Sequence, residues 1–144
     1  MIQRWQSVLL LIISILFGLE FVFGFATNES NTTQIFSDGL FNVHDHIGLT
    51  IITVLGAILS IAAIFLYNNR SLQMKVGYSV ILMAIVLPIF AGYVFNSQIP
   101  DIANSTHTYE IGTFLPIGVI IVGAIAIKLI KKDDKLVQSM DRLR

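Results

Sequence analysis

Four long apolar runs divide the chain and predict membrane-spanning helices. The runs lie near residues 8–26, 48–67, 76–95 and 111–130. A helix needs about 20 mostly apolar residues to cross the roughly 30 Å hydrocarbon core of a bilayer, and each run is long enough. Within the four runs only Glu20 and Lys128 carry charge. Because the runs are apolar on every side, they favour membrane helices over the one-sided helices of a soluble bundle.

The spacing of the runs predicts how the helices are arranged. Residues 68–75 form so short a connection that the second and third helices must be antiparallel neighbours. We therefore expect one domain over residues 1–144, an all-α membrane protein with four transmembrane helices in an antiparallel bundle. Apolar residues recur at helical spacing in the charged tail 131–144, at Leu136, Val137, Met140 and Leu143. This pattern predicts a short C-terminal interfacial helix.

Basic residues predict the orientation in the membrane. All of them lie at the N-terminus, in the 68–75 turn or near the C-terminus: Arg4, Arg70, Lys75, Lys128, Lys131, Lys132, Lys135, Arg142 and Arg144. The 27–47 and 96–110 loops contain none. Since basic flanks stay in the cytoplasm, we expect both termini to be cytoplasmic and both long loops to be outside.

The first run also has some features of a secretory signal. Arg4 precedes the apolar stretch, and residues 24–26 loosely match a small-x-small cleavage site. Cleavage would leave three spans. Two features favour a retained helix instead. The apolar run is long, and the segment before the site contains the charged Glu20 and the aromatic Phe21 and Phe23.

Composition limits the classes of function. The chain is 55% hydrophobic and only 12% charged, with too few charges to coat a soluble surface. The formal net charge of zero provides no basic field for nucleic acid. Without cysteine there are no disulfides, thiolate metal sites or cysteine nucleophiles. No phosphate loop, nucleophile elbow or HExxH motif occurs, so we expect neither an enzyme nor a resident cofactor.

Small residues predict the faces through which the helices meet. Lipid tails are as apolar as leucine, so helices associate in membranes through close packing, which small residues allow. The expected contact faces are Ser14 with Gly18, Gly56 with Ser60 and Ala63, Ala84 with Pro88 and Gly92, and Gly123 with Ala126. Pro88 and Pro116 each lack a backbone donor and are candidate kinks. Ordinary packing is a simpler explanation of these residues than a substrate cavity.

Glu20 is the candidate intramembrane polar site. It lies about 9 Å inside the outer end of the first run at 1.5 Å per residue, so its carboxyl should face the bundle or a water-filled cavity. One interpretation is a proton or cation relay. The other is a structural glutamate that holds helices together, which we favour because the runs contain no second acid.

Histidines in the outer loops are the candidate metal ligands. His44 and His46 flank Asp45 in one loop, and His107 lies near Glu110 in the other. Imidazole and carboxylate together suit zinc, copper or iron. A shared site would require the two loops to meet. Surface histidines near lipid headgroups are the alternative and the default interpretation.

Three segments resemble a known family. These are the start Met1-Ile2-Gln3-Arg4-x-Gln6, the central turn at residues 65–73, and the tail at residues 132–144. Together they resemble the bacterial four-span membrane family catalogued as domain of unknown function 4293, over essentially the whole chain. Asp134 stands where that family suggests glutamate, and Gln138 where a basic residue is common. The resemblance implies a cytoplasmic-membrane protein of a Gram-negative-type bacterium with a retained first helix, and it implies no activity.

These observations lead to a ranked set of hypotheses. The first is a non-enzymatic subunit or scaffold of a membrane complex, which binds a membrane-protein partner, a second copy or lipid. Its interaction residues would be those of the cytoplasmic face: Arg4, Arg70, Lys132, Asp141, Arg142 and Arg144. The alternatives are a small transporter or ion-handling protein using Glu20, and a metal- or haem-binding protein using His44, His46 and His107.

Overall fold

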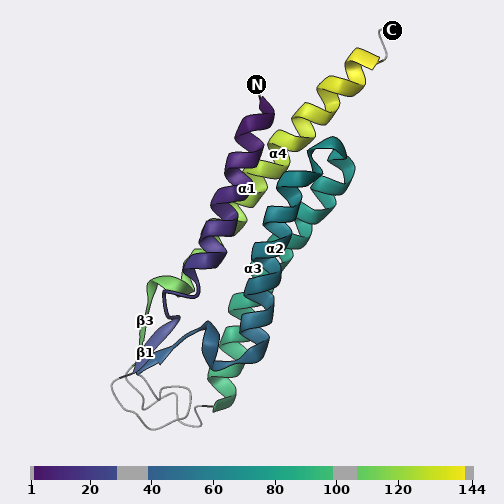
Figure 1. Ribbon diagram of the computed structural model, residues 1–144. Helices are drawn as coiled ribbons and strands as arrows, with labels where there is room; N and C mark the ends of the chain where they lie inside the picture. The colour runs from purple at the N-terminus through teal and green to yellow at the C-terminus, as the bar shows by residue number, and fades with distance from the viewer. Residues whose placement is uncertain (1, 29–38, 99–106, 142–144) are drawn as a thin grey trace.

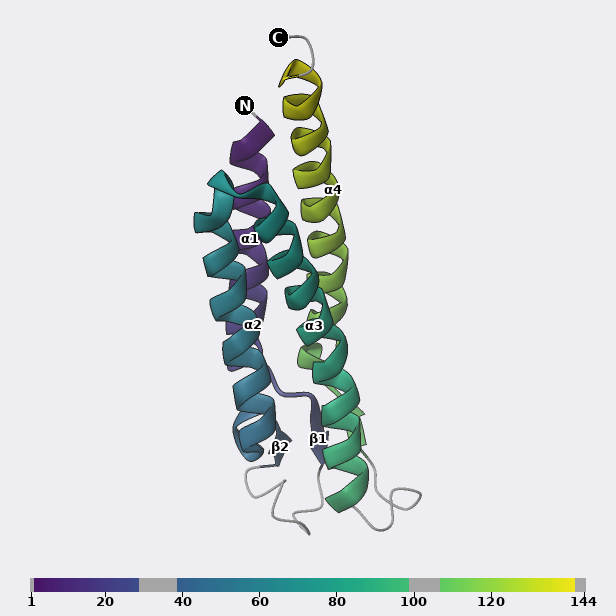
Figure 2. The same ribbon diagram turned by 90° about the vertical axis from the view of Figure 1, so that its right-hand side faces the viewer.

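The computed structural model describes residues 2–28, 39–98 and 107–141, and these form an antiparallel bundle of helices (Figures 1 and 2). The helices are α1 (Ile2–Leu19), α2 (Ile47–Phe65), α3 (Arg70–Gln98) and α4 (Leu115–Asp141). Each helix packs against two others, in the cyclic order α1, α2, α3, α4. The predicted all-α, four-helix fold class is confirmed.

The two ends of the bundle differ in structure. At one end α1 begins, α4 ends and the 3-10 turn η3 (Leu66–Asn68) joins α2 to α3; we call it the turn end. At the other end, the sheet end, α1 and α3 end and α2 and α4 begin (Figure 1). Three described strands lie there: one follows α1, one precedes α2 and one precedes α4. The described part of α4 rises beyond the other helices at the turn end (Figure 2). Because α4 continues to Asp141 without a break, the predicted tail helix is the last part of α4.

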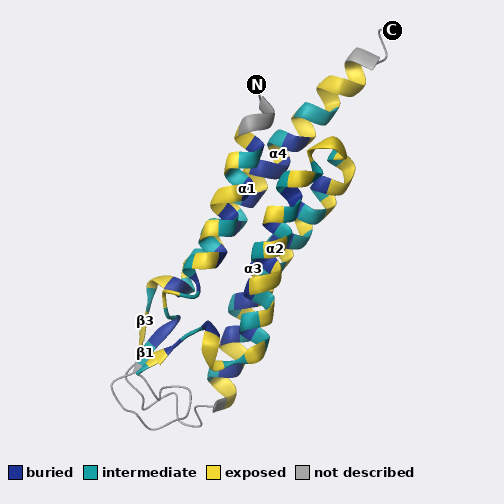
Figure 3. Cartoon of the chain, viewed as in Figure 1, coloured by how far each residue is buried: buried dark blue, intermediate teal, exposed yellow. Residues whose placement is uncertain are grey.

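Three of the helices are long and apolar enough to cross a membrane. The apolar segments are Ile47–Asn68, Arg70–Ser97 and Ile111–Ser139, whereas the apolar segment of α1, Trp5–Leu19, is shorter. Side chains on the outward faces are exposed and apolar (Figure 3), for example Ile51, Ile58 and Ile89. This pattern is typical of a membrane protein, whose surroundings are as apolar as its core.

Glycines allow the helices to pack closely. The buried ring of Phe17 in α1 lies directly over Gly56 of α2, where a Cβ would be 2.5 Å from ring carbon Cζ. Ser60 and Ala63 continue the same buried face, as predicted. Gly18 is different, because it is exposed and has no atom within 4 Å of its Cβ position. It therefore makes none of the helix contacts that we predicted for it.

The two prolines have different effects. Pro88 lies inside α3, where its missing N–H leaves a carbonyl of the preceding turn without its helical donor. Pro116 is the second residue of α4, where backbone N–H groups have no helical partner in any case. The expected loss of a hydrogen bond therefore applies to Pro88 and not to Pro116.

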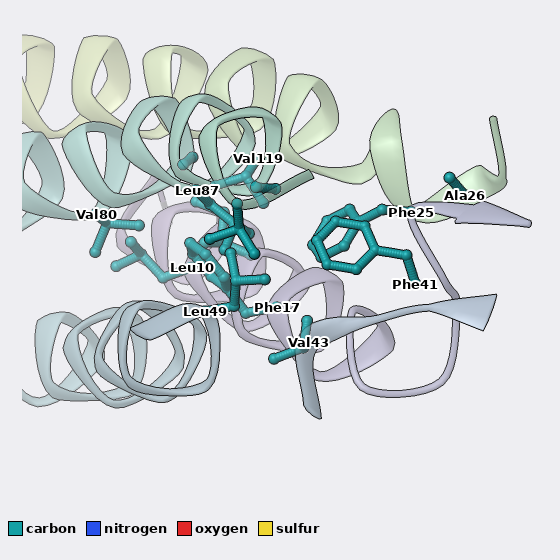
Figure 4. Packing of buried hydrophobic residues seen from close by; sticks show 14 of the residues in the cluster. Leu10, Phe17, Phe25, Ala26, Phe41, Val43, Leu49, Val80, Leu87 and Val119 are labelled. Atoms are coloured by element: carbon teal, nitrogen blue, oxygen red, sulfur yellow. The ribbon is translucent and has the colours of Figure 1, made fainter. Parts of the chain in front are cut away.

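A small antiparallel sheet brings the two long loops together. Strand β1 (Ala26–Asn28) lies between β2 (Leu40–Phe41) and β3 (His107–Tyr109). Ala26 pairs with Phe41 on one side and with Tyr109 on the other. This sheet explains why α1 ends at Leu19 although the apolar run continues to residue 26. Phe25 donates its N–H to Phe41 at 2.7 Å and is a buried core residue rather than a turn of helix (Figure 4).

Candidate functional site

The α2–α3 connection at the turn end is held in one conformation by side chains. Asn69 precedes α3, and its Oδ1 accepts a hydrogen bond from the Leu72 N–H at 3.1 Å. Gln73 is 2% exposed and donates from Nε2 to the Ala63 carbonyl of α2 at 2.9 Å. The last carbonyls of a helix lack intrahelical partners, so this bond caps α2 from the facing helix.

Arg70 attaches this connection to α4. Its Nη2 lies 2.9 Å from Oδ2 of Asp133, and its Nη1 donates to the Asp133 backbone carbonyl at 2.8 Å. The two side chains are 22% and 16% exposed, so both are largely shielded from water. Arginine suits such a two-point contact because its donors are fixed in a planar fork.

A polar hollow of about 630 Å³ lies between the connection and the end of α4. Its lining residues are Tyr67, Asn68, Asn69, Arg70, Ser71, Asp134 and Val137. They offer amide, hydroxyl and carboxylate groups, together with one apolar side chain from α4. The contact between Arg70 and Asp133 keeps the two walls of the hollow together.

A known protein family matches almost the whole chain, including the residues that line this hollow. The family model described as "Domain of unknown function (DUF4293)" matches residues 2–143, nearly the whole chain. The chain belongs to this family. No curated protein and no solved structure matches it. The predicted membership is therefore confirmed, and the DUF4293 match by itself assigns no activity.

The structure changes the role expected of the cytoplasmic-face residues. Arg70 contacts Asp133 inside the protein, while Lys132 is exposed. The side chains of Arg4 and Asp141, and all of Arg142 and Arg144, lie outside the described residues. Sequence reasoning missed Asp133. A signal was present, because a basic residue in the first turn of a helix is disfavoured by the helix dipole and so implies an acidic partner.

Glu20 lies in the interior of the described structure. It lies in the turn after α1 and is 1% exposed. Neither carboxyl oxygen has a hydrogen-bond partner among the described residues. A buried polar group without a partner costs about 1–3 kcal/mol, so Glu20 is held in place by the surrounding packing. It does not line the polar hollow.

The three histidines occupy separate structural positions. His46 is the N-cap of α2, where its Nδ1 accepts the Gly48 N–H at 3.0 Å. The ring of His44 packs on Phe21, with centroids 5.4 Å apart. His107 pairs through its backbone with Asn28 on β1, on the opposite side of that strand from β2. The described residues contain no group of three metal-ligating side chains, and the His107 side chain lies outside them, so the three-histidine site stays a prediction.

Proposed function

We propose that this DUF4293 protein is a multi-pass protein of the bacterial cytoplasmic membrane with both termini in the cytoplasm. The distribution of basic residues supports this orientation. Those with described side chains all lie in α3 or α4 toward the turn end: Arg70, Lys75, Lys128, Lys131, Lys132 and Lys135. The described residues of the sheet end contain no lysine or arginine. Positive charge at one end of a membrane bundle marks the cytoplasmic side.

In this proposal α1 crosses the membrane together with the turn that follows it. Its 18 residues are about 27 Å long at 1.5 Å per residue, against roughly 30 Å of hydrocarbon. The apolar residues Phe21, Val22 and Phe23 after the helix supply the remaining depth.

The function supported best is that of a non-enzymatic subunit or scaffold of a membrane complex. The observation that carries it is the two-point contact between Arg70 and Asp133, which joins the turn and α4 around the polar hollow. A preformed concave surface with convergent polar groups is typical of a recognition site. Asp134 is the one carboxylate in its lining, and its Oδ2 accepts a hydrogen bond from Gln138 at 2.8 Å. With no histidine or lysine beside it, the lining supports binding rather than catalysis.

The proposed partner is a membrane protein with a cytoplasmic segment that enters this hollow. Such a partner would contact Asp134 and Val137 of α4 and the amides of Asn68 and Asn69. The alternative function as an ion-handling protein has less support, because Glu20 has no described polar partner through which a proton or cation would pass.

Crosslinking in the native membrane tests the proposal. An affinity tag inserted within residues 29–38 leaves both termini free, and mass spectrometry identifies what co-purifies after crosslinking. A matched pair of variants locates the contact: Val137 lines the hollow at 37% exposure, whereas Leu136 beside it is 45% exposed and does not line it. We expect a stoichiometric partner that Val137→Asp reduces about tenfold and Leu136→Asp leaves in place.

Other outcomes contradict specific parts of the proposal. Equal loss with both variants would point to lipid contact along the whole tail. An intact, abundant protein with no partner would overturn the subunit function. The orientation has its own test, because a chain without cysteine accepts single-cysteine labelling. An impermeant maleimide added to intact cells should label Leu40→Cys and leave Lys135→Cys unlabelled, and the reverse pattern would refute the orientation.

A further inference from the structure

A second hollow, of about 310 Å³, lies at the sheet end of the bundle. Its walls come from three parts of the chain: the β1–β2 region, the second half of α3, and the β3–η5 region, where η5 is the 3-10 turn Ile111–Thr113. Three phenylalanine rings line it one after another. The centroids of Phe25 and Phe41 are 5.7 Å apart, and those of Phe41 and Phe95 are 5.8 Å apart. Figure 4 shows Phe25 and Phe41 beside each other in the part of the buried cluster nearest the sheet.

The small residues of α3 keep this hollow open. Pro88, Ala91 and Gly92 form the first part of the α3 wall, before Phe95 and Asn96, and none of the three extends a long side chain into the space. A Cβ at Gly92 would meet no atom within 4 Å. Gly92 is also exposed, so the hollow reaches the outside of the bundle at this residue. Ile89 and Tyr93 on the same helix are each 68% exposed. In a membrane-spanning helix such side chains face lipid, so the opening faces lipid as well.

The polarity of the lining changes along the hollow. Pro88, Ala91 and Gly92 make the part nearer the middle of the bundle apolar, while Asn96 and Tyr109 supply polar groups beside the phenylalanines at the part farther along α3. Pro88 and Asn96 are separated by eight residues, or about 12 Å of helix. Thr113 also lines the hollow, but its hydroxyl donates to the Phe25 carbonyl at 2.6 Å. The lining therefore suits a ligand that is hydrocarbon along most of its length and polar at one end.

We propose that this hollow binds one acyl chain of a membrane phospholipid from the outer leaflet, with the ester region of the lipid beside Asn96 and Tyr109. The volume lies at the small end of the range for ligand pockets, about 300–1,000 Å³, which fits a single chain. The position of Tyr109 fits the membrane–water interface, where tyrosine is enriched. The site is independent of the hollow at the turn end and rests on the proposed membrane embedding, and its assignment to the outer leaflet rests on the proposed orientation.

Gly92→Leu is the variant that should close the site. The helix accepts the new Cβ without a clash, and the leucine side chain would occupy the opening. Gly18→Leu is the matched control, because Gly18 is also an exposed helical glycine with no atom within 4 Å and does not line the hollow. Both changes replace glycine by a stronger helix former, so neither is expected to unfold the bundle.

Photolabelling measures occupancy of the hollow. The full-length protein is placed in vesicles of phosphatidylethanolamine and phosphatidylglycerol that contain a trace of phospholipid with a diazirine at the end of one acyl chain. After irradiation, mass spectrometry locates the label. Surrounding lipid reaches exposed residues such as Ile51, but it does not reach Phe25 and Phe41, which are 4% and 1% exposed. Label on these two buried rings therefore shows that a lipid acyl chain has entered the protein.

All label is normalised to the label on Ile51. In the natural protein we expect label on Phe25 and Phe41. We expect about tenfold less label on these two rings in Gly92→Leu, and the same amount as in the natural protein in Gly18→Leu. The natural protein by itself can refute the idea: label on Phe25 and Phe41 no greater than on Leu10, which is 1% exposed and lies in the core of α1, would overturn it. Equal label in the natural protein and Gly92→Leu would also overturn it, whatever the stability of that variant.

Discussion

The contact between Arg70 and Asp133 yields a quantitative prediction. Asp133→Asn keeps the shape of the side chain and the backbone carbonyl that accepts from Nη1, but it removes the charge that pairs with Nη2 across 2.9 Å. Hydrogen bonds to charged groups contribute about 1.5–3 kcal/mol to folding stability. Partial exposure of the pair, 22% and 16%, screens the interaction, so we expect a loss of about 1–2 kcal/mol.

A double-mutant cycle isolates the pair from other effects. Arg70→Gln, Asp133→Asn and the double variant are compared with the natural chain by reversible unfolding in mixed micelles, followed by far-ultraviolet circular dichroism. We expect the two changes to be non-additive by about 1–2 kcal/mol. Asp134→Asn is the control on the neighbouring acid, whose Oδ2 accepts a hydrogen bond from the exposed Gln138 side chain at 2.8 Å. It should cost less than about 0.5 kcal/mol.

Additive effects of the two substitutions on the free energy of unfolding would contradict this prediction. A coupling energy below about 0.3 kcal/mol is within the range seen for independent sites. It would mean that water or a rearranged side chain replaces the pair at no cost. The turn and α4 would then not be held together by this contact, and the binding surface proposed at the turn end would lose its structural basis.

Two further predictions concern buried positions, and the same unfolding assay checks both. Gly56→Ala should destabilise the protein by about 1–3 kcal/mol, because its Cβ would lie 2.5 Å from the buried Phe17 ring. The control Gly18→Ala should stabilise by up to about 1 kcal/mol, since that site is open and alanine favours helix; the same sign for both would contradict the packing. Glu20→Leu should be neutral or stabilising by about 1 kcal/mol, because it replaces a buried carboxyl without a described partner by an apolar side chain. A loss above about 2 kcal/mol would show that Glu20 has a partner that stabilises the fold.

The pattern of apolar and basic residues along the chain predicts the helices and the end at which the basic residues gather. In hydrocarbon every backbone N–H and C=O must be satisfied internally, so an apolar run of about 20 residues has essentially one solution, a helix. The small face of α2 at Gly56, Ser60 and Ala63 was predictable for a related reason, because close approach requires small side chains. The first run shows where this logic ends. Its composition predicts helix to residue 26, yet the helix stops at Leu19 because Phe25 bonds to Phe41 in the sheet.

Which polar residues meet depends on how the helices and strands pack, and the sequence does not reveal it. Arg70 and Asp133 are 63 positions apart, and the strands at the sheet end bring together Ala26 and Tyr109 from distant parts of the chain. Both hollows likewise have walls from segments distant in sequence. Hydropathy describes the preference of each segment for its surroundings, and many pairings of loops and helix ends satisfy that preference equally well. The specific pairing depends on side-chain shape and hydrogen-bond geometry across the bundle, which the order of residues along the chain does not display.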